Sequence, residues 1–173
     1  LPAAQLAKQR RSDVQAVVHP ASNIRPYFIE KYPDIESWAR LSDPDADRFD
    51  IIASADYALA CSGTVTSELA MQETPFLVGY HTGWLTWALA RFLLFKPAHI
   101  TLLNIAAGDK EIVPEFVQTK FKAEAMADVA IQRLNDETAR QAQISAQKKA
   151  LAAMGEGQLQ SADIAASVLL QRD

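Results

Sequence analysis

The stretch ACSGTVTSELAMQETPFLVGY, from Ala60 to Tyr80, contains an apolar run, a small polar turn, a helical segment and a second apolar run. The first run, YALAC, begins at Tyr57, and the second, FLVGY, begins at Phe76. Both are short and are bounded by Pro, Gly, Asp or Ser, which is typical of buried strands. Thr64–Gln72 between them has helical composition. Because parallel strands need crossover connections, this order predicts a parallel sheet.

The same alternation extends from the start of the chain to about Gln118. From Lys122 onward the sequence is rich in Ala, Gln, Glu and Lys without a strand pattern, which predicts two or three closing helices. We therefore expect an α/β fold with a doubly wound parallel sheet. The further strands that we expect are Gln15–His19, Ile100–Asn104 and, more weakly, Glu36–Leu41.

The bulk composition describes an ordinary globular chain. Its 173 residues are 49% hydrophobic and 22% charged, enough to bury the core of one domain. The net charge of −4 leaves no basic surface for nucleic acid, so we expect no nucleic-acid partner. The single cysteine, Cys61, excludes an internal disulfide and indicates a reducing compartment. The three histidines and Cys61 have no metal-ligand spacing, so we expect neither a metal nor another cofactor.

No targeting or membrane-spanning segment is recognisable. The chain opens with LPAAQLAKQRRSD, which resembles the back half of a helix and lacks an initiator methionine, so we expect a fragment. The longest apolar run, Trp84–Phe95, is too short to span a bilayer. This helix is either buried between the sheet and the closing helices or lies at a membrane surface. One of its faces carries Trp84, Trp87, Arg91 and Phe95.

The tripeptide Ser62-Gly63-Thr64 lies between the end of a strand and the start of a helix. In open α/β sheets, ligands bind at this end of the strands. The first N–H groups of a helix lack intrahelical partners, and glycine allows a ligand to approach the backbone closely. The turn therefore predicts an anion site, most naturally for phosphate. The alternative is an ordinary helix N-cap, where Ser and Thr are favoured whatever the function.

Glu68 lies four residues after Thr64, on the same face of the predicted helix. It is not part of a capping box, because that motif needs Ser or Thr where this chain has Val65. A carboxylate at this place could accept hydrogen bonds from the hydroxyls of a ribose, as in other nucleotide-binding sheets. A solvated glutamate without a ligand remains the alternative.

Other residues that could carry chemistry receive structural interpretations. His81 follows a predicted strand, where a lone histidine is more often a structural hydrogen-bonding residue, and His19 could border the same cleft. Cys61 is expected to be a small core residue. The acidic run Asp43–Asp47 is expected to be a loop that ends in a helix N-cap, and the basic run Lys8–Arg11 a solvated helix face.

The run SGTVTSELAMQETPFLVGY, followed by WLTWALARFLL, ITLLNIAAG and EIVPEFVQ, resembles the lipid-A-disaccharide synthases. That family has Ser-Gly-Thr-x-Thr-x-Glu, a strand with Pro and a terminal Tyr, and a Leu-Thr helix with Ala-Arg. It continues with Leu-Pro-Asn-x-x-Ala-Gly and Val-Pro-Glu-x-x-Gln. The order and spacing of these segments over roughly Ala53–Gln118 make the match specific, whereas Leu1–Arg48 and Phe121–Asp173 fit only in texture.

The resemblance implies a glycosyltransferase of the GT-B type, with two Rossmann-like domains. Residues 1–120 would be part of the nucleotide-sugar-binding domain, and residues 121–173 a helical segment packed on it. The family transfers 2,3-diacylglucosamine from UDP to 2,3-diacylglucosamine 1-phosphate in lipid A biosynthesis. By resemblance the diphosphate would lie at Ser62, Gly63 and Thr64, the ribose at Glu68, and the cleft at Asn104 and Gln118.

The resemblance also implies the surroundings of the reaction. The partners would be the UDP-activated sugar and a lipid-linked acceptor, and the protein would be cytoplasmic and peripheral at the inner membrane. Trp84, Trp87, Arg91 and Phe95 would then face lipid. Assembly of identical chains stays open.

This chain departs from the family in two ways. Leu103 replaces a proline of the family's loop, and Gly108-Asp109-Lys110 stands where the family usually has an arginine. The chain also resembles a donor domain without its first strand. The acceptor domain, which is expected to supply the general base, is absent from the match, so the catalytic residues are unknown and we expect this chain alone to be inactive.

Three other interpretations stay open at this point. A UDP-sugar epimerase shares the fold, but it would show Ser-Gly-Gly with adjacent acids instead of Ser-Gly-Thr with one acid. A remnant that binds UDP without catalysis, or an interaction domain that binds no nucleotide, would also fit the pattern.

Overall fold

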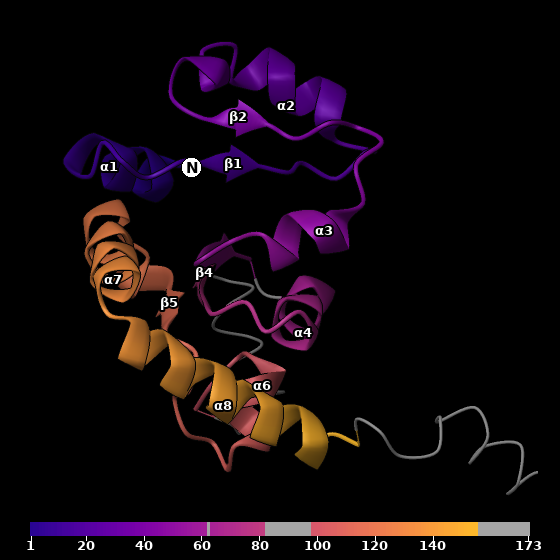
Figure 1. Ribbon diagram of the computed structural model, residues 1–173, viewed down its shortest axis with the longest axis vertical. Helices are drawn as coiled ribbons and strands as arrows, with labels where there is room; N and C mark the ends of the chain where they lie inside the picture. Colours follow the sequence, from indigo (N-terminus) through magenta and orange to yellow (C-terminus); the bar gives the residue numbers. More distant parts are fainter. Residues whose placement is uncertain (62, 82–97, 156–173) are drawn as a thin grey trace, which may run out of the picture.

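The computed structural model describes residues 1–61, 63–81 and 98–155. Within these ranges all strand pairings are parallel, and the strands alternate with helices (Figure 1). The fold is therefore α/β and Rossmann-like, with helices on both faces, as the sequence predicts. One pair of strands consists of β1 (Val17–Val18) and β2 (Arg40–Leu41), and a second sheet has the order β3 (Ala58–Ala60), β4 (Phe76–Tyr80), β5 (Glu115–Val117).

The described helices connect these strands or close the fold after them. Those that precede β3 are α1 (Pro2–Arg10), α2 (Arg25–Lys31), the 3-10 helix η1 (Ile35–Ser37) and α3 (Arg48–Ala53). Those that follow β3 are α4 (Thr64–Met71), α6 (Leu102–Ala106), the 3-10 helix η3 (Gln118–Lys120), α7 (Ala123–Asn135) and α8 (Glu137–Ala153).

Strand β4 is the centre of the fold, because it pairs with a strand on each side and is buried on both faces. Phe76, Leu77 and Val78 are each 0% exposed. Successive strand residues point to opposite faces, so Phe76 and Val78 belong to one core cluster and Leu77 to the other. A strand buried in this way reads as a continuous apolar run, which is why FLVGY is recognisable in the sequence.

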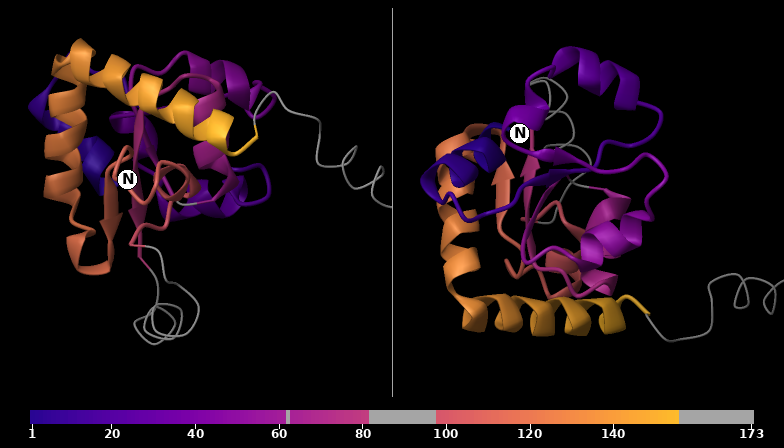
Figure 2. Two further views of the ribbon diagram at one scale, coloured as in Figure 1. Left: turned by 90° about the horizontal axis from the view of Figure 1, so that it is seen from below. Right: turned by 45° about the horizontal axis from the view of Figure 1, so that its top comes forward.

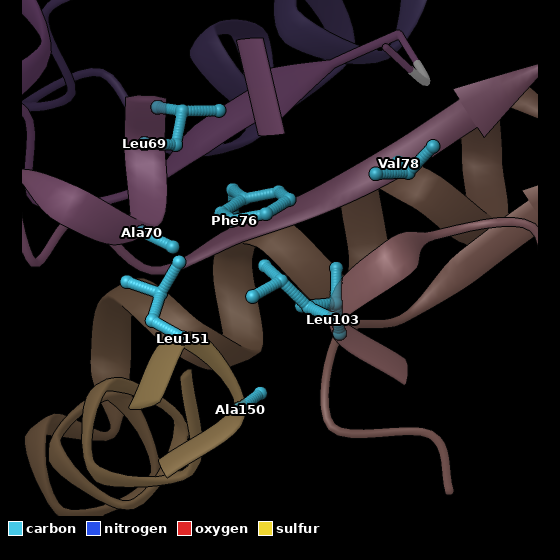
Figure 3. Packing of buried hydrophobic residues seen from close by; sticks show 8 residues of the cluster. Leu69, Ala70, Phe76, Val78, Leu103, Ala150 and Leu151 are labelled. Atoms are coloured by element: carbon cyan, nitrogen blue, oxygen red, sulfur yellow. The ribbon is translucent and has the colours of Figure 1, made fainter. Parts of the chain in front are cut away.

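The larger cluster joins the sheet to α4, α6 and α8. Figure 3 shows Phe76 lying between Leu69 of α4, Leu103 of α6 and Leu151 of α8. Two glutamines of α8 reach the backbone on the same side: Gln143 donates to the carbonyl of Phe76 at 2.6 Å, and Gln147 to that of Thr74 at 3.3 Å.

The opposite face of the sheet is covered by α1 and α7, which lie side by side (Figure 2). Ala3 of α1 packs with Leu77 of β4 and Ala130 of α7. Arg10 of α1 forms an ion pair with Asp128 of α7. The basic run Lys8–Arg11, which is predicted to be a solvated helix face, therefore also contributes one contact between two helices.

Most of the predicted elements are confirmed with shorter bounds. The strand Phe76–Tyr80 is found as predicted, and Thr64–Gln72 contains α4. Asp47 is the N-cap of α3, and its carboxylate accepts from the N–H of Phe49 at 2.8 Å. Of the weak strand near Glu36–Leu41, only the end forms β2, because a 3-10 turn occupies its first half.

The strand predicted at Ile100–Asn104 is wrong. The chain forms α6 there, and the strand next to β4 is β5, which the sequence reading missed. A short apolar run fits a buried strand and a buried helix equally well by periodicity. The helix is selected by a tertiary contact, because the carboxylate of Glu115 accepts from the N–H groups of Ile100 and Thr101 just before α6 begins.

We predict that Gly79→Ala destabilises the fold by about 1–3 kcal/mol, the usual cost of overpacking. A Cβ at this position would lie 2.6 Å from Met126 Cε and 2.7 Å from Phe121 Cε2. Urea denaturation measures the loss. The loss should shrink in a Phe121→Ala background, since the ring is the stiffer neighbour; an unchanged loss would show that the overlap is not its cause.

Candidate functional site

The turn between β3 and α4 has a backbone that only glycine adopts readily. Gly63 is the N-cap of α4 with φ +144° and ψ −163°, a region nearly restricted to glycine. Thr66 holds the turn from inside, because its hydroxyl donates to the Gly63 carbonyl at 2.7 Å and its N–H reaches the same oxygen at 3.1 Å. Thr66 is 2% exposed, so this part of the turn is fixed by the core.

The outer side of the same turn is open. Gly63 and Thr64 are exposed, and no atom lies within 4 Å of the position of a Cβ on Gly63. In the described part of the chain, no side chain caps the start of α4. Because the N–H of Thr66 already reaches the Gly63 carbonyl, the donors available to an anion among the described residues are the N–H groups of Thr64 and Val65 and the Thr64 hydroxyl, beside the positive end of the helix dipole.

Glu68 is held on α4 by an arginine of α3. Arg48 Nη2 lies 2.8 Å from Glu68 Oε1, and the side chains are 54% and 18% exposed respectively. The pair orients the carboxylate while using one of its two oxygens. A carboxylate has about four acceptor sites, so capacity for hydroxyl donors remains.

The carboxyl ends of β3, β4 and β5 lie at one edge of the sheet, since the strands are parallel. The residues that follow them are Cys61, His81 and Gln118. His81 is exposed, and its ring lies 6.0 Å from the ring of Phe121. Gln118 starts η3 with φ +51°, a turn that ends the strand at this edge. Cys61 is exposed, so the prediction that it is a core residue is wrong.

His19 lies at the corresponding end of the β1–β2 pair. Its Nδ1 is 2.8 Å from the hydroxyl of Ser42, and Arg25 Nη2 donates to the Ser42 carbonyl at 2.7 Å. These contacts hold together the loops after β1 and β2, so His19 has a structural partner in addition to its place at the edge.

Asn104 is 0% exposed and holds the segment that leads from α6 to β5. Its Nδ2 donates to the Val113 carbonyl and to Glu115 Oε1, both at 2.9 Å. Its Oδ1 accepts from the N–H groups of Ile112 at 2.9 Å and Val113 at 2.8 Å. These contacts use the full capacity of an amide side chain. A direct contact of Asn104 with a nucleotide stays a prediction.

Two carboxylates accept hydrogen bonds from the four consecutive backbone N–H groups of residues 98–101. The side chain of Glu115 is 6% exposed and accepts from the N–H groups of Ile100 and Thr101. The Asp109 carboxylate accepts from the N–H of Ala98 at 2.9 Å and from the N–H of His99 at 3.3 Å. Asp109 has φ +59°, which aspartate tolerates better than most residues. Asp109 belongs to the segment in which this chain differs from the family's usual arginine, and it therefore has a structural role here.

Several predicted residues lie outside the described residues. They are Ser62 of the turn and the candidate lipid-facing residues Trp84, Trp87, Arg91 and Phe95.

The family model described as lipid-A-disaccharide synthetase matches residues 1–169. This chain belongs to the lipid-A-disaccharide synthetase family.

Over the aligned residues, relatives in the family are about a third identical to this chain. A lipid-A-disaccharide synthase of Anaeromyxobacter dehalogenans is 35% identical over 156 residues, which is 90% of this chain and 40% of the relative. One of Rhodospirillum centenum is 30% identical over 169 residues, 96% of this chain and 41% of the relative. One of Rickettsia conorii is 37% identical over 125 residues, 68% of this chain and 28% of the relative. The chain thus spans about 40% or less of the length of these synthases.

Sequence reasoning missed two charged residues of this family member. Arg48 follows an N-cap aspartate and is 20 positions from Glu68, so no local pattern connects them. Glu115 was recognised only as part of Val-Pro-Glu-x-x-Gln, and its contacts with residues 100–104 come from the tertiary fold. A glutamate at the start of a short apolar strand is the one signal that could have indicated it.

Membrane-spanning helices and metal-ligand clusters are both absent from the residues that the structure describes. No helix there is long and apolar enough to cross a membrane. No group of three or more His, Cys, Asp or Glu side chains there could hold a metal ion.

We predict that Asn104→Ala destabilises the protein by about 2–4 kcal/mol, because it leaves two buried backbone groups of Val113 and the Glu115 carboxylate without this partner. Chemical denaturation measures the loss. The matched variant at the exposed Asn23, Asn23→Ala, should change stability by less than about 0.5 kcal/mol. Equal losses at the two positions would contradict the role assigned to Asn104.

Proposed function

We propose that this chain is the donor-nucleotide-binding portion of a lipid-A-disaccharide synthase. The reaction would transfer 2,3-diacylglucosamine from UDP to 2,3-diacylglucosamine 1-phosphate, with UDP as the second product. The observation that carries the proposal is the open start of α4 at the carboxyl end of β3, in a chain that belongs to this family. Residues 1–120 would form the nucleotide-binding unit, and the helices after residue 120 would pack on it.

The diphosphate would lie at the Gly63 turn. The open N–H groups at the start of α4 and the hydroxyl of Thr64 are donors that need no rearrangement to meet a phosphate. Ser62 would add a second hydroxyl, by resemblance. Negative charge grows on UDP as the glycosidic bond breaks, so fixed donors at this place stabilise the transition state more than the ground state.

The uridine ribose would be held by Glu68. Glu68 lies four residues after Thr64, on the same face of α4. The ion pair with Arg48 orients its carboxylate and uses only one of the two oxygens. Arg48 would therefore be a positioning residue, because it acts through the carboxylate.

Gln118 and Asn104 would serve the same site in different ways. Gln118 follows β5 at the edge where the turn of Gly63 lies, so we propose that it lines the donor cleft. Asn104 has its amide engaged with Val113 and Glu115 and would act by holding the segment between α6 and β5 in place.

The acceptor would be lipid-linked and would be met at the surface of the inner membrane, on the cytoplasmic side. We propose that the general base belongs to the part of the synthases that this chain does not span. Trp84, Trp87, Arg91 and Phe95 would contact lipid, a role that rests on the sequence pattern.

We predict that the chain binds UDP in a calorimetric titration, and that Glu68→Gln and Thr64→Val each weaken binding about tenfold or more. A hydrogen bond to a charged group is worth roughly 1.5–3 kcal/mol, which corresponds to this factor. Arg48→Gln should weaken binding less than Glu68→Gln does, since the carboxylate is retained.

Matched controls separate loss of the site from loss of the fold. Glu124→Gln and Thr138→Val change the same residue types at exposed positions of α7 and α8, and they should leave UDP affinity unchanged. A folded chain that does not bind UDP would refute the donor site and favour an interaction domain. Binding that survives both Glu68→Gln and Thr64→Val would place the nucleotide elsewhere.

We predict that the chain alone releases no UDP from the activated sugar in the presence of the acceptor. Activity should appear when the amino-terminal portion of the Anaeromyxobacter dehalogenans synthase is added, since that portion would complete the cleft. A UDP-release assay with both lipids measures it. Binding of UDP without transfer under any such combination would support a nucleotide-binding remnant instead of a synthase.

A further inference from the structure

His81 lies at the centre of the carboxyl edge of the β3–β4–β5 sheet, because it directly follows β4, the middle strand. The last residue of β4, Tyr80, pairs with Val117, the last residue of β5. The next residues of the two segments, His81 and Gln118, are therefore level with each other. Neighbouring strands lie about 4.8 Å apart, so Gln118 is the neighbour of His81 on this side.

The turn of Gly63 lies on the other side of His81. Strands β3 and β4 pair Ala60 with Val78. Three residues further along the two segments come Gly63 and His81, so the turn is reached at the level of the histidine. His81 thus stands between the Gly63 turn and Gln118, two parts of the proposed donor site.

The ring of His81 is supported by the ring of Phe121. Side chains alternate along a strand, so His81 shares a face with Leu77 and Gly79, the face that α1 and α7 cover. The ring centroids of His81 and Phe121 lie 6.0 Å apart, and the rings are tilted by 43°. Phe121 finds room beside the strand because Gly79 has no side chain: a Cβ there would lie 2.7 Å from Phe121 Cε2.

The nitrogens of this supported ring are available to a ligand. His81 is exposed, and neither of its ring nitrogens forms a hydrogen bond or an ion pair with another described residue. The other two histidines are engaged. Nδ1 of His19 lies 2.8 Å from the Ser42 hydroxyl, and Nδ1 of His99 lies 3.4 Å from Glu115 Oε2.

The position of Glu68 gives the direction in which a nucleotide would cross this edge. Its carboxylate is paired with Arg48 of α3, the helix that leads into β3. His81 instead follows β4, the strand on the far side of the Gly63 turn from α3. With the ribose at Glu68 and the first phosphate at the Gly63 turn, the second phosphate extends toward His81.

The Gly63 turn has few donors for the two phosphates of a diphosphate. Among the described residues they are the N–H groups of Thr64 and Val65 and the Thr64 hydroxyl. Arg48 of α3 is already engaged in its ion pair. The imidazole of His81 adds one N–H donor when it is neutral and two when it is protonated. Hydrogen bonds from such donors to anionic oxygens are short and strong, so a phosphate suits this ring.

We propose that His81 binds the sugar-side phosphate of the donor nucleotide and stabilises UDP as it leaves; this inference rests on the proposed function. When the bond between the sugar carbon and the phosphate oxygen breaks, its electron pair stays on that oxygen. The acceptor hydroxyl forms the new bond to the sugar carbon, and its proton goes to the general base. The N–H of His81 therefore meets charge that grows during the reaction, where a fixed donor is most effective.

The test compares UDP with UMP, which lacks the second phosphate, in calorimetric titrations of the chain. His81→Leu should weaken UDP binding about tenfold or more, the usual effect of one hydrogen bond to a charged group, and change UMP binding less than about twofold. His81→Arg keeps N–H donors and a positive charge, so it should retain most of the UDP affinity. Glu68→Gln is the control for the ribose and should weaken both ligands, since both carry it.

A second measurement uses the unchanged chain. It has three histidines, so their ring signals can be followed by NMR while nucleotide is added, and His81→Leu identifies the signal of His81. UDP should shift this signal more than UMP does. His99, held by Glu115, serves as the internal reference.

The outcomes separate this inference from the donor site itself. UDP and UMP affinities that both stay unchanged in His81→Leu, or that fall equally, would overturn the role of His81, while binding that still depends on Glu68 would leave the donor site standing. A folded chain that binds neither nucleotide would overturn both. Should His81→Leu fail to fold, the Glu68→Gln variant still tests the donor site. A set of histidine signals that UDP and UMP shift alike in the unchanged chain would then overturn the role of His81.

Discussion

The burial of β4 on both faces is the constraint on which the rest of the structure depends. Leu77 needs a cover on one side, and Phe76 and Val78 need one on the other, so helices must lie on both faces of the sheet. Connections through helices make neighbouring strands parallel, and parallel strands bring all their carboxyl ends to one edge. The candidate site is at that edge because the core requires this topology.

The Gly63 turn at this edge combines a fixed inner side with an open outer side. Thr66 holds the Gly63 carbonyl from within the core, while Gly63 and Thr64 face outward. The side-chain amide of Asn104 makes all four of its hydrogen bonds to backbone and carboxylate partners, and these bonds hold the loop between α6 and β5 in place. Such an arrangement suits a site whose donors must be in place before the ligand arrives.

The family assignment applies to a chain that spans only part of its relatives' length. The chain matches its family along nearly its whole length yet spans about 40% or less of the compared relatives.

The sequence by itself determined the α/β class, the strand Phe76–Tyr80, the helix after Gly63 and the family, because each depends on neighbours in the chain. It could not tell α6 from a strand, since a short apolar run fits both and the carboxylate of Glu115 decides between them. It also could not pair Arg48 with Glu68. Tertiary structure alone decided these features, because they join residues that the local pattern leaves unconnected.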